Sequence, residues 1–149
     1  MRTRVALSFL FAALLACSQS MWPSAQVASP FPHRTALKCT LTMAHNLGWK
    51  AAARNSNRSI YGTKPDSVRQ IDEYRRYSFI DADLSPTDAG GTEIKMQVGA
   101  KGMYQGRAGP FERDVAPSAA AQADAKEIMR RCGIGDSTAL IRDTTLDNP

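Results

Sequence analysis

The stretch 78–100 reads SFIDADLSPTDAGGTEIKMQVGA and holds two β-strand patterns on either side of a turn. Residues 85–91, SPTDAGG, combine proline, aspartate and glycines, which is strong turn chemistry. After the turn, apolar and polar residues alternate over 94–100, a period of two that is typical of a half-buried strand. Before it, residues 68–84 contain β-favouring tyrosine, phenylalanine and isoleucine. The pattern predicts a β-hairpin.

Downstream of the hairpin, residues 118–132 predict an α-helix. Ser118 follows Pro117 as an N-cap residue, and Gly133 suits the position after the last turn. One apolar stripe lies at helical spacing, formed by Ala121, Ala125, Ile128 and Cys132. We expect 107–117 to be a loop and 134–149 to be a polar tail.

Upstream of the hairpin, the residues alternate again. Leu37, Cys39, Leu41 and Met43 are separated by polar residues, which predicts a strand from residue 35. The next stretch, 44–54, reads AHNLGWKAAAR, and its alanines favour a first helix. Residues 55–67 then read as loop.

These elements predict an α+β domain over 35–133, in the order β-α-β-β-α. A small antiparallel sheet would be covered on one face by two helices. Cys39 and Cys132 both fall on apolar faces, so we expect a disulfide that joins the first strand to the last helix. It would close a loop of about 94 residues, worth at most about 4–5 kcal/mol. The alternative, two buried free thiols, would be natural only in the cytosol.

The N-terminus has the pattern of a signal peptide over 1–16. Arg2 and Arg4 precede an uncharged apolar run at 5–16. A membrane-spanning helix needs about 20 apolar residues, so this run is too short to be a comfortable anchor. Ordinary signal peptidase would cut before Gln19, since Ala16 and Ser18 are small.

A second processing route explains the cysteine at the end of this run. Leu14-Leu15-Ala16-Cys17 resembles the lipobox of bacterial lipoprotein precursors, a likeness that covers residues 1–18 only. The resemblance implies a diacylglycerol on the Cys17 thiol and cleavage just before it, and Ser18 after the cysteine implies passage to the outer membrane. The proline-containing residues 17–34 would then be the lipidated cysteine and a flexible tether.

The charge is moderate but uneven. The chain carries +5, of which the leader arginines supply +2. Residues 34–76 hold nine basic and three acidic side chains, whereas 77–149 hold eight and eleven. We interpret this as two solvated faces, with a basic face towards an anionic partner as the sharper alternative. We expect no nucleic-acid partner.

Residues suited to catalysis are few. His33 falls in the expected tether and His45 on a helix surface, no G-x-S-x-G elbow occurs, and no Cys/His spacing suggests zinc. Asp81 and Asp83 share a strand face and could act as a carboxylate pair, although a solvated face is the simpler interpretation. The glycines at 99–109 suit bulges better than a phosphate cradle. We therefore expect a non-enzymatic protein without metal or cofactor.

The cluster 74–77, Tyr-Arg-Arg-Tyr, is the most suggestive of binding. Strand alternation places Arg75 with Tyr77 on one face, where they are candidate partner-binding residues. Ordinary cross-strand packing is the favoured alternative. The sequence predicts a lipid-anchored binding protein of the cell envelope, at the outer membrane or else in the soluble periplasm. Its partners would be the membrane and an envelope protein or anionic polymer; the alternative is a periplasmic inhibitor or immunity-type protein that blocks a toxin or hydrolase.

Overall fold

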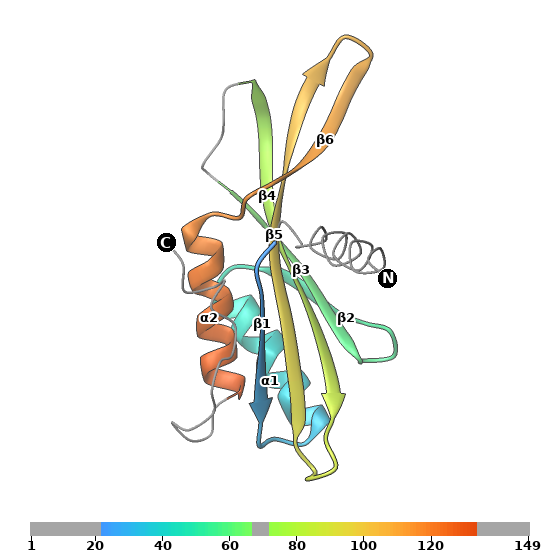
Figure 1. Cartoon of the computed structure of the whole chain (residues 1–149), viewed down its shortest axis with the longest axis vertical. Coiled ribbons are helices and arrows are strands. Elements are labelled where there is room, and N and C mark those ends of the chain that lie inside the picture. The colour runs from blue at the N-terminus through green and yellow to red at the C-terminus, as the bar shows by residue number, and fades with distance from the viewer. Residues whose placement is uncertain (1–21, 67–71, 134–149) are drawn as a thin grey trace, which may run out of the picture.

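The computed structural model describes residues 22–66 and 72–133, which form a six-stranded antiparallel sheet and two helices (Figure 1). The strands are β1 (Ser24–Ser29), β2 (Lys50–Arg54), β3 (Ser59–Pro65), β4 (Glu73–Pro86), β5 (Thr92–Gly106) and β6 (Gly109–Val115). The helices are α1 (His33–Asn46) and α2 (Ala119–Gly133). Both pack on one face of the sheet (Figure 1). The predicted α+β class is confirmed. The expected signal peptide 1–16, Cys17 and the tail 134–149 lie outside the described residues.

The strand order is β1-β5-β4-β3-β2, and β5 is long enough to pair with two strands along one edge. Its first half pairs with β1 and its second half with β6, which carries the β5–β6 hairpin beyond the helices (Figure 1). The predicted hairpin is β4 and β5, which are neighbours inside the sheet. Its core-facing pairs are Ile80 with Val98, Ala82 with Met96 and Leu84 with Ile94, and all six side chains are buried.

Helix α2 forms as predicted. The Ser118 hydroxyl accepts a hydrogen bond from the Ala121 amide at 3.2 Å, which caps the first turn. The predicted stripe is buried in the core. In the last turns, Glu127 accepts hydrogen bonds from Arg130 and Arg131, and these bonds lower its pKa to about 2.

The strand predicted from residue 35 is wrong, because these residues belong to α1. Ala36, Leu37, Thr40 and Ala44 are the buried set, which is a helical spacing. Thr40 interrupts the apolar pattern, but its hydroxyl donates to the Ala36 carbonyl at 2.9 Å and can therefore be buried within a helix. Cys39, Leu41 and Met43 pack only at the margin of the core.

The first helix predicted over 44–54 is also wrong. Helix α1 ends at Asn46, and Gly48 follows with φ +86°, a left-handed conformation that favours glycine. Lys50–Arg54 then forms β2, the outer strand beside β3, with Ala51 and Ala53 packed against the core. Pairing with β3 thus outweighs the helix preference of three alanines.

The expected tether over 17–34 is too long. Residues 24–29 form β1, with Ala25, Val27 and Ser29 buried, and His33 begins α1. The prolines that indicated a tether, Pro23, Pro30 and Pro32, flank the strand and do not interrupt it. The folded domain therefore includes Trp22 and does not begin at residue 35.

Two segments expected to be loops are mostly strand. Ser59–Pro65 is β3 and Gly109–Val115 is β6. The glycine and proline in β3 argued against a strand there. Strand β6 exposes every residue between Gly109 and Val115, so it has no apolar alternation. The intervening turn 55–57 holds Asn55, Ser56 and Asn57 at positive φ.

The predicted disulfide between Cys39 and Cys132 is present, with the Cα atoms 5.6 Å apart. Because Cys39 lies on α1, the bond joins the two helices to each other and not a strand to a helix. Cys132 is fully buried, and its carbonyl accepts a hydrogen bond from the Ser29 hydroxyl at 2.7 Å. The disulfide and this hydrogen bond together connect α1, α2 and the end of β1.

Candidate functional site

The face of the sheet opposite the helices, here called the uncovered face, holds the alternate residues of β4. In β4 the core side chains Ile80, Ala82 and Leu84 point to the helices. Arg75, Tyr77, Phe79, Asp81 and Asp83 therefore point the other way. This confirms that Arg75 and Tyr77 share one face. Arg76 lies on the helix side, where it is buried with Glu73.

A groove of about 410 Å³ lies on the uncovered face. Its size falls in the range of small-molecule sites, about 300–1,000 Å³. Every strand except β1 contributes to its lining, which consists of Lys50, Tyr61, Thr63, Lys64, Pro65, Arg75, Tyr77, Met103 and Glu112. Both sequence-predicted residues line this groove.

Two cations of the groove are available to a ligand. Lys50 and Arg75 are exposed, and within residues 22–66 and 72–133 neither forms an ion pair. The third cation, Lys64, already donates to the Leu47 carbonyl and pairs with Asp124. Guanidinium and ammonium groups bind carboxylates and phosphates, and a guanidinium does so in a bidentate manner. The groove therefore offers two cations, Lys50 and Arg75, to an anionic ligand.

The wall of the groove at β6 is a polar network around Glu112. The Tyr77 hydroxyl donates to Glu112 Oε1 at 3.3 Å, and Lys101 Nζ lies 3.5 Å from Oε2. Burial raises the pKa of Tyr77, and the charge of Glu112 raises it further. Burial lowers the pKa of Lys101, but Tyr77 and Glu112 raise it and the net shift is upward. Tyr77 is therefore a neutral hydrogen-bond donor, and Lys101 compensates the one carboxylate in the lining.

A row of aromatic rings crosses the uncovered face beside the groove. Trp22 meets Phe79 edge-on with ring centroids 4.7 Å apart, and Phe79 stacks with Tyr61 at 5.9 Å. The Arg54 guanidinium lies 3.9 Å above the Tyr61 ring. Gly99 permits this packing, since a Cβ there would collide with the Phe79 and Trp22 rings. Phe79 is buried by these rings, since within the described residues both helices pack on the other face of the sheet.

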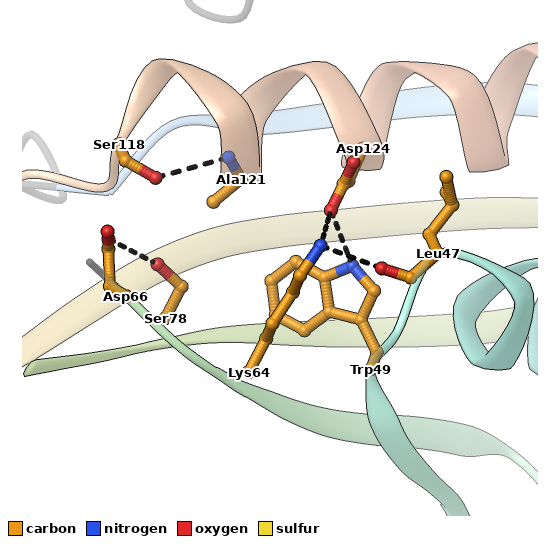
Figure 2. Close-up of polar contacts among 8 residues, drawn as sticks. All are labelled: Leu47, Trp49, Lys64, Asp66, Ser78, Ser118, Ala121 and Asp124. Atoms are coloured by element: carbon orange, nitrogen blue, oxygen red, sulfur yellow. Dashed lines mark hydrogen bonds and ion pairs between the residues drawn. The ribbon is translucent and has the colours of Figure 1, made fainter. Parts of the chain in front are cut away.

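A second polar cluster lies between the sheet and α2 (Figure 2). Lys64 Nζ donates to the Leu47 carbonyl at 2.7 Å and pairs with Asp124 at 2.8 Å. Trp49 Nε1 donates to the same carboxylate oxygen at 3.0 Å. Nearby, the Ser78 hydroxyl donates to Asp66. This cluster connects α1, β3 and α2, so we assign it a structural role.

The other residues considered for catalysis from the sequence, two aspartates and two histidines, lie outside the groove. Asp81 and Asp83 are both exposed; burial and the charge of Asp83 raise the pKa of Asp81, while Arg54 opposes them. His33 lies in the first turn of α1, not in a tether, and its Nε2 is 2.8 Å from the Asn57 carbonyl oxygen. His45 is exposed on α1, with Nε2 2.8 Å from the Ala51 carbonyl oxygen. These contacts fix the turn 55–57 and the outer edge of β2.

Of the residues that line the groove, only Arg75 and Tyr77 were predicted from the sequence. Lys50, Tyr61 and Thr63 come from strands interpreted as helix and loop, and Glu112 comes from a segment interpreted as loop. The alternation of Ile60 and Gly62 with Tyr61 and Thr63 was the available signal for β3.

The sequence matches no protein-family model and no curated protein. Within residues 22–66 and 72–133, neither helix has the length and apolar character needed to cross a membrane.

Proposed function

We propose that this chain is a non-enzymatic binding protein of the bacterial cell envelope, anchored by lipid at Cys17, whose groove captures an anionic envelope component. The binding role is supported by two cations that line the groove, Lys50 and Arg75, neither of which forms an ion pair with another described residue. The lipobox-like sequence before Cys17 supports the anchor, and Ser18 favours the outer membrane, facing the periplasm. The Cys39–Cys132 bond suits an oxidising compartment.

The groove supports binding more than catalysis. Its lining combines two cations with hydroxyl and aromatic groups, which suit recognition of an anion. Asp81 and Asp83, the carboxylate pair that an enzyme would use, do not line it. The function proposed is therefore capture and retention of a partner at the membrane surface.

Arg75→Glu combined with Tyr77→Ala is expected to abolish capture of the partner from cross-linked envelopes. Truncating a binding anchor costs about 2 kcal/mol or more, so loss of two predicts roughly a thousandfold weaker binding. Both residues are at least partly exposed, so the melting temperature should stay near that of the wild type. Quantitative mass spectrometry of the captured material measures the effect.

The matched control is Arg34→Glu with Thr42→Ala on α1. It makes the same change in charge at exposed positions on the other side of the molecule, and it should capture as the wild type does. A folded Arg75/Tyr77 variant with undiminished capture would refute a binding role for the groove.

A further inference from the structure

The chain enters the domain on the uncovered face. The Trp22 ring packs against Phe79 over Gly99, both of which lie on that face. The next residue, Pro23, accepts a hydrogen bond from the Val98 amide at 3.0 Å, and β1 follows directly. The point from which any N-terminal anchor would hold the domain is thus fixed near the middle of β5.

The anchor would be close to this point. Trp22 stands five positions after Cys17, and five residue steps span at most about 18 Å even when fully extended. A lipid on Cys17 would therefore hold the entry point, which lies on the uncovered face, within about 18 Å of the membrane surface. This step rests on the proposed function, because it takes Cys17 as the lipidated residue.

The groove lies on the same face and next to the entry point. The aromatic row leads from Trp22 through Phe79 to Tyr61, and Tyr61 is itself part of the groove lining. Among the described residues, Lys50 and Arg75 in the groove have no ion pair, whereas Asp81 and Asp83 lie on the same face outside the groove. The groove lining therefore offers two cations to a ligand, because Lys64 is paired with Asp124 and the carboxylate of Glu112 is paired with Lys101.

We propose that the groove binds the phosphate headgroup of an anionic lipid in the membrane that carries the Cys17 anchor. Charge complementarity favours a phosphate as the ligand, because the Lys50 and Arg75 side chains in the lining donate well to phosphate oxygens. The short distance to the membrane favours the lipid as its source, since tethering gives a high effective concentration of headgroups at the groove. Basic residues near an anionic membrane surface are attracted to it in the same way.

The test uses the whole chain with Cys17→Ser, purified from the periplasm without an acyl group. It is sedimented with vesicles of phosphatidylethanolamine and phosphatidylglycerol, and with vesicles of phosphatidylethanolamine and phosphatidylcholine. We expect binding to the first only, weakened by salt because the attraction is screened. Lys50→Glu with Arg75→Glu should lower the vesicle affinity at least about tenfold. The control Arg34→Glu with Lys38→Glu, at exposed positions on α1, should bind as the unsubstituted chain does.

Competition distinguishes a membrane lipid from a soluble anion. Free glycerol phosphate should displace the vesicles only at concentrations far above that of the accessible lipid. Displacement at equal concentrations would overturn the lipid assignment, as would equal vesicle binding by the groove variant. Because the tested chain has no acyl group, failure to bind phosphatidylglycerol overturns this inference alone and leaves the anchoring at Cys17 to its own test.

Discussion

Replacing both Cys39 and Cys132 with alanine is expected to lower the free energy of unfolding by about 4–5 kcal/mol. The two residues are 93 apart in sequence, so the bond restricts a large part of the unfolded chain. In the folded state it holds α1 against α2 beneath the sheet. Small domains have only about 5–15 kcal/mol of stability, so the variant should be close to unfolding at room temperature. Urea unfolding monitored by circular dichroism measures the loss.

The wild type in excess reductant is the control for lost side-chain packing. It retains both sulfur atoms and should lose a similar amount of stability. A loss below about 1 kcal/mol in both experiments would show that the bond contributes little and that packing alone positions the helices.

Glu73→Ala is expected to cost about 3–5 kcal/mol, the second large effect. Arg76 Nε lies 3.1 Å from Glu73 Oε1, and both side chains are nearly inaccessible to solvent. The Tyr104 hydroxyl also donates to Oε1, at 3.4 Å. Without the carboxylate, the Arg76 guanidinium remains buried and uncompensated, which is costly in a medium of low polarity. Chemical denaturation measures the change.

Two further variants separate charge burial from packing. Glu73→Ala with Arg76→Met removes both charges and should recover most of the loss. Glu112→Ala breaks the exposed pair with Lys101 and should cost no more than about 1 kcal/mol. If Glu73→Ala cost no more than Glu112→Ala, the buried pair would not stabilise the fold as argued.

The hairpin and the last helix were predictable because local and tertiary preferences agree there. The turn 85–91 has turn chemistry, β4 and β5 alternate where only one face is covered by helices, and the α2 stripe lies on a capped helix. The disulfide pairing was predictable for a different reason, since Cys39 and Cys132 are the two cysteines left once Cys17 is assigned to the leader or to lipidation, although Cys39 packs only at the margin of the core.

Helix α1 and strand β2 could not be predicted from local pattern. Leu37 to Met43 alternates in polarity, yet the buried set includes the polar Thr40, whose hydroxyl is satisfied within the helix. The alanines of 51–53 favour helix, but Gly48 ends α1 before them and β3 offers a partner strand. Whether such segments form helix or strand depends on the elements that they pack against or pair with in the fold.

The candidate site shows the same limit. Alternation along β4 placed Arg75 and Tyr77 on one face, and both line the groove. It could not place Lys50, Met103 and Glu112 beside them, because that requires the register of β2, β5 and β6. The position of Trp22 on the uncovered face was likewise hidden, since it depends on β1 pairing with a strand some 70 residues later.

The central claim is that a lipid on Cys17 holds the uncovered face at the membrane. The most direct measurement is the intact mass and N-terminal sequence of the protein extracted from membranes of the producing bacterium. We expect a chain that begins at Cys17 and carries the mass of a diacylglycerol, with further acylation at its amino terminus. A chain that begins at Gln19, carries no acyl mass and is found in the soluble fraction would contradict it.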